Sequence, residues 1–241
     1  MRINTNTIFS LIIPSRARTR LLVNCLKSFF GKAKYRKNIE AIILADYDDK
    51  SMRDFEYISS DNIKVVFQHQ SDKMIKNYNN YGTQCSTGDF VWMLNDDYEM
   101  TTQNWDEIIH EDVKEFLKDK HDKVIYIQVD DDTHRGEKAE KLGSCCPILS
   151  SETVDIQNGI MPEEIDMWGA DIWLYWIFKK LPQNRILNLS NKVKVLHHCR
   201  HNNTISKLDS TAQNVEKISK KGHLTDEEFN KYINLFSRNL A

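Results

Sequence analysis

The sequence lacks the features that mark disulfide-rich, zinc-binding, membrane-spanning and nucleic-acid-binding proteins. Its five cysteines are odd in number and form no CxxC pair, so neither a disulfide framework nor a zinc site is indicated, and a reducing compartment is expected. No apolar run approaches the roughly 20 residues that a membrane-spanning helix needs. The formal net charge of -2 provides no basic field for binding nucleic acid.

A secretory signal, internal repeats and low-complexity segments are also absent from the sequence. The apolar stretch IFSLII at residues 8–13 is too short for a signal core and runs into Pro14 and three arginines. We therefore expect a soluble cytoplasmic protein, with peripheral contact to a membrane left open. A length of 241 residues, 40% of them hydrophobic, suits one compact domain with or without an appendage.

Short apolar strands and amphipathic helices alternate in the first half of the chain. Strands are predicted at residues 8–14, 39–46, 61–68, 89–94 and 123–129, and helices at 19–30, 72–85 and 104–119. This alternation predicts an α/β fold with a mostly parallel, Rossmann-like sheet that is flanked by helices.

The second half of the chain has a different pattern. Residues 133–144 are predicted to form a polar loop, residues 167–181 an aromatic-rich helix, and residues 192–203 a strand that ends in histidines. A helix is predicted at residues 225–236, where Thr225 and Glu228 match a capping box. We expect a catalytic domain at residues 1–205 and a C-terminal helical extension at residues 206–241.

Acidic side chains end three of the predicted strands, at Asp46, at Asp96 with Asp97, and at Asp130. In parallel α/β sheets, ligands bind beyond the carboxyl ends of the strands. Clustered carboxylates repel one another unless a counter-charge is present, and Mg²⁺ or Mn²⁺ bound to a diphosphate is one such charge. The tripeptide NDD at residues 95–97 alone leaves two interpretations equally open, a metal–diphosphate site and a solvated turn that caps the next helix.

Four stretches, in order along residues 8–200, resemble glycosyltransferase family 2. They are SLIIPSRARTRLLVNCLKSF, IILADYDDKS, NNYGTQCSTGDFVWMLNDDYEM and MWGADIWL. The resemblance implies a GT-A fold and metal-assisted transfer of a sugar from a nucleotide-diphosphate donor to an acceptor hydroxyl, with inversion. The acceptor, whether glycan, lipid or protein, is not specified.

The resemblance also implies a role for each matching residue. Asp97 would bind Mn²⁺ or Mg²⁺, and Asp171 would be the catalytic base. Contacts with the donor nucleotide would come from Pro14, Ser15, Arg16, Arg18, Asp46, Asp48, Lys76, Asn80, Asn95 and Asp96. Contacts with the acceptor or the sugar would come from Trp168, Gly169 and Ala170.

A histidine late in the catalytic domain often completes the metal shell of GT-A enzymes, and imidazole suits Mn²⁺. His197 is the first choice because it continues the inward alternation of Val193 and Val195, and His198 is the second. Residues 130–132, VDDD with the preceding valine, are a rival metal triplet, although acceptor binding or a charged loop fits them better.

Two other classes of function remain open. A nucleotidyltransferase on a similar sheet would need a glycine-rich phosphate loop after the first strand, and PSRART contains no glycine. A catalytically inactive nucleotide- or carbohydrate-binding module would explain Asn95 and Ala170 at positions where acids are common.

Overall fold

The structure is a computed structural model that describes residues 7–53, 62–71, 75–134, 136–161, 170–198 and 226–240. Its centre is a seven-stranded sheet with the order β3-β2-β1-β4-β7-β6-β8. The strands are β1 (Phe9–Pro14), β2 (Ile39–Asp46), β3 (Ile63–Gln68), β4 (Phe90–Met93), β6 (Tyr126–Gln128), β7 (Ile148–Ser150) and β8 (Ile186–Asn188).

The sheet is mostly parallel, as the sequence predicts. Strand β1 pairs in parallel with β2 and β4, β2 pairs in parallel with β3, and β6 pairs in parallel with β8. Strand β7 runs antiparallel to both of its neighbours, β4 and β6, and so joins two parallel blocks. Because β1, β2 and β4 are adjacent and parallel, the loops that follow them lie along one edge of the sheet.

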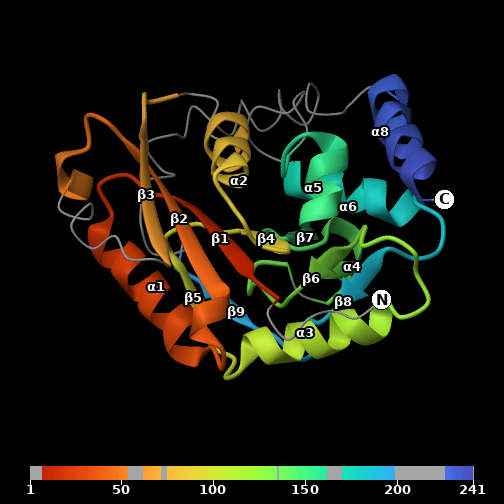
Figure 1. The fold of residues 1–241 in the computed structure, drawn as a ribbon, viewed down its shortest axis with the longest axis horizontal. Helices are drawn as coiled ribbons and strands as arrows, with labels where there is room; N and C mark the ends of the chain where they lie inside the picture. The colour runs from red at the N-terminus through yellow and green to blue at the C-terminus, as the bar shows by residue number, and fades with distance from the viewer. Residues whose placement is uncertain are drawn as a thin grey trace.

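Helices cover both faces of this sheet (Figure 1). Helices α1 (Thr19–Lys32) and α3 (Trp105–Phe116) lie on one face. Helices α2 (Tyr81–Gln84), α5 (Ser151–Gln157), α6 (Ala170–Lys180) and α8 (Asp226–Asn239) lie on the other. The remaining helical segments are η1 (Arg36–Asn38), the π-helix η3 (Ile75–Asn80) and α4 (Glu137–Leu142).

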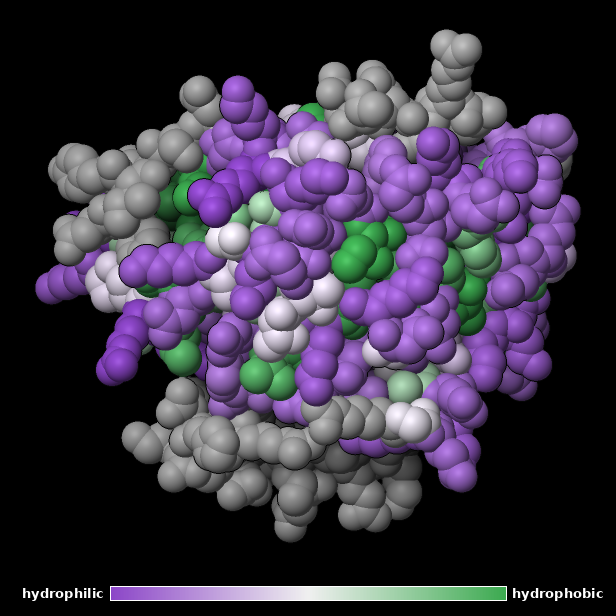
Figure 2. Space-filling model, turned by 90° about the horizontal axis from the view of Figure 1, so that it is seen from below, coloured by the Kyte–Doolittle hydropathy of each residue, from purple (hydrophilic) through white to green (hydrophobic). Residues whose placement is uncertain are grey.

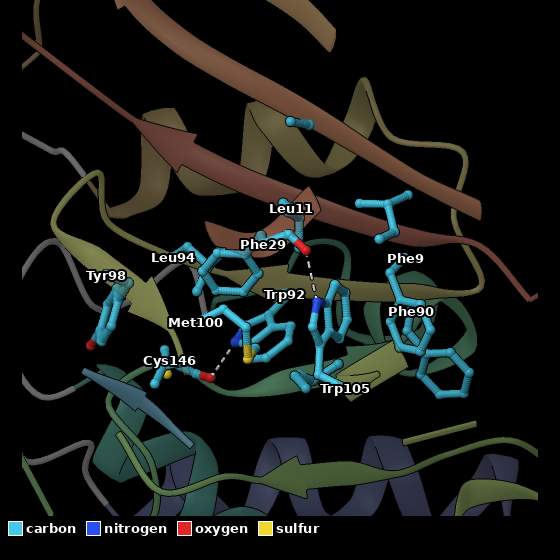
Figure 3. Packing of buried hydrophobic residues seen from close by; sticks show 14 of the residues in the cluster. Phe9, Leu11, Phe29, Phe90, Trp92, Leu94, Tyr98, Met100, Trp105 and Cys146 are labelled. Atoms are coloured by element: carbon cyan, nitrogen blue, oxygen red, sulfur yellow. Dashed lines mark hydrogen bonds between the residues drawn. The ribbon is translucent and has the colours of Figure 1, made fainter. Parts of the chain in front are cut away.

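Aromatic side chains fill the core between the sheet and the face formed by α1 and α3 (Figure 3). Trp92 and Trp105 are fully buried with Phe29, and their ring centroids lie 5.2–5.8 Å apart in edge-to-face contact. Each indole nitrogen donates a hydrogen bond of 2.9 Å, from Trp92 to the carbonyl of Cys146 and from Trp105 to that of Phe29. Burial of these large rings therefore leaves no indole donor unsatisfied.

A second apolar core lies on the opposite face and includes the C-terminal helix α8. Tyr232 packs edge-on against Trp173 of α6 at 5.0 Å, and Phe236 packs against Phe178 at 5.5 Å. The predicted C-terminal helix thus exists and packs on the sheet domain. Residues 206–225 lie outside the described part of the chain, so the boundary between residues 205 and 206 stays a prediction.

A small two-stranded sheet adds a feature that the sequence did not predict in full. Strand β5 (Tyr98–Met100) follows the NDD tripeptide directly and pairs antiparallel with β9 (Val195–His197). Tyr98 lies opposite His197 in the register. This pairing brings the predicted histidine-ended strand beside Asp97, about one hundred residues earlier in the chain.

Several predicted elements differ from the observed ones. The helix predicted at residues 72–85 is the π-helix η3 followed by the short α2, and the loop predicted at residues 133–144 contains α4. Strands β5, β7 and β8 and helix α5 were not predicted. Strands of three residues are too short to show a hydrophobic period, so their pairing depends on neighbours that are distant in sequence.

Within the described residues, no helix has both the length and the apolar character needed to cross a bilayer. On the face shown in Figure 2, hydrophobic residues form small separate areas among hydrophilic ones.

Candidate active site at the carboxyl edge of the sheet

The site begins with the loop after β1, which lies beside the acidic ends of β2 and β4. The backbone amide of Ser15 donates to the carbonyl of Leu44 at 3.0 Å, which holds the loop against β2. The Ser15 hydroxyl donates to Asp96 at 2.7 Å, although the two residues are 81 positions apart in the chain. Ser15 therefore links the ends of all three adjacent strands.

Arg18 is the counter-charge of the two adjacent carboxylates in NDD. Its guanidinium lies 3.0 Å from Asp96 Oδ1 and 2.7 Å from Asp97 Oδ2. Asp96 and Asp97 are only 2% and 4% exposed, so without such a partner their mutual repulsion would be poorly screened by water. The turn at the end of β4 is thus a buried ionic site, and the interpretation as a solvated capping turn is wrong.

The two carboxylates respond differently to this environment. Burial raises the pKa of Asp96 to about 6, against the opposing effects of Ser15 and Arg18. Burial also acts to raise the pKa of Asp97, but the nearby His197 ring and the Arg18 guanidinium outweigh it, and the pKa of Asp97 is lowered. Asp97 is therefore the carboxylate that stays charged across the physiological range.

The raised pKa of Asp96 predicts a pH-dependent stability in the protein freed of metal with EDTA. Asp96 binds a proton more tightly in the folded chain than in the unfolded chain, so its contribution to stability is present at low pH and is lost as pH rises through about 6. We expect the melting temperature to fall more between pH 5 and pH 7.5 in the parent protein than in Asp96→Asn. Equal pH slopes in calorimetry would contradict this assignment.

Asp97 and His197 lie close enough together to be neighbouring ligands of one cation. Asp97 Oδ1 is buried without a hydrogen-bond partner, and His197 Nε2 lies 3.4 Å from it. An octahedral ion with ligand distances of about 2.1 Å places neighbouring ligand atoms roughly 3 Å apart. The pair therefore fits two adjacent ligands of Mg²⁺ or Mn²⁺.

The His197 ring is held in place from two further sides. It stacks on Tyr98 with ring centroids 4.4 Å apart, and its Nδ1 lies 3.1 Å from the Thr133 hydroxyl. Such partners of the second ring nitrogen fix the orientation of a ligating histidine. Thr133 and Tyr98 were not among the predicted site residues, because no local pattern connects residue 133 with residue 197.

His198 does not share this position. Its Nε2 lies 2.8 Å from Glu99, and only its backbone amide reaches Asp97, donating to the carbonyl at 3.0 Å. Successive side chains of a strand point in opposite directions, so His197 and His198 cannot both face Asp97. The structure thus favours the first choice of histidine and does not bring the second to the carboxylate.

A second arginine, Arg16, joins the acids at the end of β2. Its guanidinium contacts Asp46 and binds Asp48 with both nitrogens, at 2.7 and 2.9 Å. Asp46 is buried and also accepts from the Tyr78 hydroxyl, while Asp48 is exposed. Burial, followed by Asp46, raises the pKa of Tyr78 to about 12, which keeps the phenol a donor.

The backbone of the arginine loop is held by Asp49, which sequence reasoning did not select. Asp49 accepts from the amide of Ala17 at 2.7 Å and from Ser51. Ala17 has a left-handed φ of 53°, which is unfavourable for a residue with a Cβ. Asp49 thus stabilises the conformation that directs Arg16 and Arg18 to different carboxylates.

The structure also shows where three further predicted donor-binding residues lie, namely Pro14, Asn95 and Asn80. Pro14 ends β1 beside Leu44, and Asn95 is exposed at the turn. The Asn80 carboxamide is used in hydrogen bonds to both backbone groups of Met161, at 3.0 and 2.9 Å. A Cβ on Gly82 would lie 2.6–2.8 Å from Ile12 and Leu44, so Gly82 allows α2 to approach the sheet.

Asp171 lies in the first turn of α6, half-buried, one residue after the buried Ala170. Burial raises the pKa of Asp171, and its own helix, His134 and the Cys145 thiol act in the opposite direction. A carboxylate with a raised pKa suits a general base.

Three of the predicted site residues lie outside the part of the chain that the structure describes. They are the acceptor residues Trp168 and Gly169 and, for its side chain, Lys76.

The rival triplet at residues 130–132 is not arranged to bind a metal. Asp131 is fully buried, and its two oxygens accept four hydrogen bonds, which uses about all the lone pairs of a carboxylate. Asp130 faces Lys194 at 3.8 Å. The ligand atoms of Asp131, His134 and Cys145 lie within 4.8 Å of one another, but both Asp131 oxygens already accept hydrogen bonds from protein donors.

The mostly parallel sheet with an antiparallel β7, the acidic edge and the short β5–β9 sheet define a GT-A type protein, and solved glycosyltransferases share this fold. Residues 10–144, more than half of the chain, match the sequence model of glycosyl transferase family 2. The chain belongs to this family. No curated protein matches the chain significantly in sequence.

Two solved proteins illustrate the likeness in fold. Residues 1–349 of TarS from S. aureus, crystallised with UDP, are 18% identical with a TM-score of 0.57, over 78% of this chain and 60% of that one. TarS has also been crystallised with UDP-GlcNAc. The mannosyltransferase PcManGT from Pyrobaculum calidifontis, in complex with GDP-Man and Mn²⁺, is 11% identical with a TM-score of 0.65, over 96% of this chain and 69% of that one. The chain thus spans about 60% of the length of the TarS fragment.

Proposed function

We propose that this protein transfers a sugar from a nucleotide-diphosphate donor to an acceptor hydroxyl, with inversion and with the help of Mn²⁺ or Mg²⁺. The observation that carries the proposal is the buried Asp97 Oδ1, which has no hydrogen-bond partner and faces His197 Nε2 at 3.4 Å, beside two arginines. The family and the nucleotide-sugar complexes of proteins with the same fold support this proposal.

Asp97 and His197 would hold the cation, which neutralises charge on the leaving diphosphate. Arg16 and Arg18 lie on the same loop and present guanidinium groups, which match phosphate oxygens well. Arg16 is 43% exposed and is therefore able to leave Asp48 and bind a phosphate. Asp96 and Ser15 fix the position of this loop relative to Asp97.

Asp171 would accept the proton of the acceptor hydroxyl as the hydroxyl oxygen attacks the anomeric carbon. Inversion requires this base to lie on the side of the sugar away from the leaving group. Asp171 comes from α6, while Asp97 follows β4 and His197 ends β9, so the proposed base and the proposed cation ligands come from different elements.

The proposal is tested by incubating the purified protein with a panel of UDP-, GDP- and dTDP-sugars, with Mn²⁺ or with EDTA, and measuring nucleotide diphosphate release. Release that depends on Mn²⁺ supports the proposal. Pyrophosphate release from a nucleoside triphosphate and a sugar phosphate would indicate a nucleotidyltransferase instead. Binding of nucleotide without turnover of any donor would indicate an inactive binding module.

Asp46 provides a separate prediction about donor binding. Asp46→Ala should raise the donor KM more than it lowers kcat, because it removes a partner that positions Arg16 in the ground state and the transition state alike. The matched control is Asp48→Ala, which removes an exposed partner of the same arginine and should have a smaller effect. A fall in kcat at constant KM in Asp46→Ala would show that Asp46 acts on the chemical step.

A further inference from the structure

Residues 130–133, which include the rival acidic triplet, run alongside the chain that forms β9. The backbone amide and carbonyl of Asp130 hydrogen-bond the chain on either side of Lys194, at 3.0 and 2.8 Å, and the two residues form a parallel bridge. Three positions further along each segment stand Thr133 and His197. The fold therefore brings residue 133 to the histidine of the proposed cation pair.

A buried carboxylate fixes the backbone around Thr133. Asp131 is fully buried, and one of its oxygens accepts from the amides of Thr133 at 2.9 Å and His134 at 2.8 Å. Its other oxygen accepts from the Ser144 hydroxyl at 3.0 Å and from the amide of Cys145. Because these bonds join two separate segments of the chain, the position of Thr133 is set by the packed fold.

The His197 ring has two orientations that keep its contact with Tyr98. The two rings stack with centroids 4.4 Å apart and planes inclined by 19°. A half-turn of the imidazole about its bond to Cβ preserves this stack, but it exchanges ring nitrogen and ring carbon positions, so stacking alone does not direct Nε2 to Asp97. The Thr133 hydroxyl, 3.1 Å from Nδ1, has a hydrogen-bond partner in only one of the two orientations. That orientation is the one in which Nε2 lies 3.4 Å from Asp97 Oδ1.

The same contact determines where the ring proton lies when His197 binds an ion. A ring nitrogen that ligates a metal carries no proton, so a ligating Nε2 requires the proton on Nδ1. Nδ1 then donates to the Thr133 hydroxyl oxygen, and the hydroxyl hydrogen is directed to the carbonyl of Asp131, 3.4 Å away. Asp97 Oδ1 has no hydrogen-bond partner, which agrees with an Nε2 that directs no proton to it.

We propose that Thr133 is a positioning residue for the cation site: its hydroxyl selects the ring orientation and the proton position that leave His197 Nε2 able to bind Mn²⁺ or Mg²⁺. The inference rests on the proposed role of Asp97 and His197 as cation ligands. The rival triplet then contributes to the cation site by fixing the position of Thr133, without ligating the ion. Removing such a partner of the second ring nitrogen typically weakens metal binding about 10–100-fold.

The binding test compares Thr133→Val, which removes the hydroxyl at similar volume, with Thr133→Ser, which retains it. The matched control is Thr101→Val, because the Thr101 hydroxyl donates to the carbonyl of Lys194 at 2.8 Å and so contacts the same segment. Mn²⁺ binding is measured by electron paramagnetic resonance at one fixed concentration of UDP or GDP. Thr133→Val should weaken Mn²⁺ binding about tenfold, whereas Thr133→Ser and Thr101→Val should bind Mn²⁺ like the parent.

A double-mutant cycle with His197→Ala separates positioning of the ring from a general loss of structure. In protein that already contains His197→Ala, the added change Thr133→Val should have no effect on Mn²⁺ binding, because Thr133 acts through the histidine. Parent-like binding by Thr133→Val, or an equal loss with and without His197, would overturn the inference.

A second measurement needs neither activity nor a bound ion. In protein labelled with nitrogen-15 in its histidine rings and treated with EDTA, the His197 signals are identified by their loss in His197→Ala, and nuclear magnetic resonance shows which ring nitrogen carries the proton. The parent should carry it on Nδ1, and Thr133→Val should lose this preference. An unchanged proton position in Thr133→Val would overturn the inference. A changed position in a protein that binds no Mn²⁺ would support the positioning by Thr133 and refute the proposed cation.

Discussion

Asp97→Ala is expected to abolish sugar transfer and to remove the Mn²⁺ dependence of nucleotide binding. Asp97 Oδ1 is the buried oxygen that faces His197, and Oδ2 is held by Arg18 at 2.7 Å. Without the carboxylate, the cation would keep one protein ligand of the proposed pair, and Arg18 would be left with Asp96. Loss of a charge-neutralising cation at the leaving diphosphate removes several kcal/mol of transition-state stabilisation, roughly 10³-fold or more in rate.

The measurement is diphosphate release, combined with Mn²⁺ binding in the presence of nucleotide followed by electron paramagnetic resonance. His197→Ala should weaken Mn²⁺ binding in the same assay, and His198→Ala should not, because its ring contacts Glu99. Asp130→Asn is the control in the rival triplet, since Asp131 is a fully bonded structural residue whose replacement would disturb the fold. Full activity of Asp97→Ala with loss of activity in Asp130→Asn would show that the cation binds at residues 130–132 and not at Asp97.

Asp171→Asn is expected to fold, to bind nucleotide with Mn²⁺, and to transfer sugar at least a hundredfold more slowly. General-base contributions are typically about 10²–10⁴ in rate, and an amide cannot accept the proton. Asp171 also lies at the start of a helix, where an acid is favoured by the helix dipole alone. Asparagine loses the interaction with the dipole but can still form a capping hydrogen bond, so the size of the rate loss separates a base from a cap.

Stability provides an independent check on the same variant. Burial raises the pKa of Asp171 in the folded chain, so the charged carboxylate destabilises the fold once pH exceeds the pKa of the unfolded chain. Asp171→Asn should therefore have a higher melting temperature than the parent at pH 7.5, and the difference should shrink toward pH 3. A near-parent transfer rate would instead identify a cap, and the base would then be sought at Asp166 or Glu164, which lie outside the described residues.

The local pattern of the sequence was sufficient to predict the parallel part of the sheet and the acids that follow its strands. Strands β1, β2 and β4 are continuous apolar runs of four or more residues between helices with a clear period, and such runs need no distant partner to be recognised. The order of four motifs along the chain also indicated the family that residues 10–144 match. Asp97 and Asp171 were selected on this basis, and His197 was selected because it continues the alternation of Val193 and Val195.

The tertiary structure alone decided which side chains meet, because the sheet order brings together residues that are 79–100 positions apart. It assigned Arg18 to the NDD acids and Arg16 to Asp46, and it separated His197 from His198 through the register of β5 with β9. It also surrounded the Asp131 oxygens with protein donors and left Asp97 Oδ1 without a hydrogen-bond partner, although both are aspartates after a buried segment. The sequence determines the residue type and the strand end, but the number of donors around a carboxylate depends on loops that only the folded chain brings together.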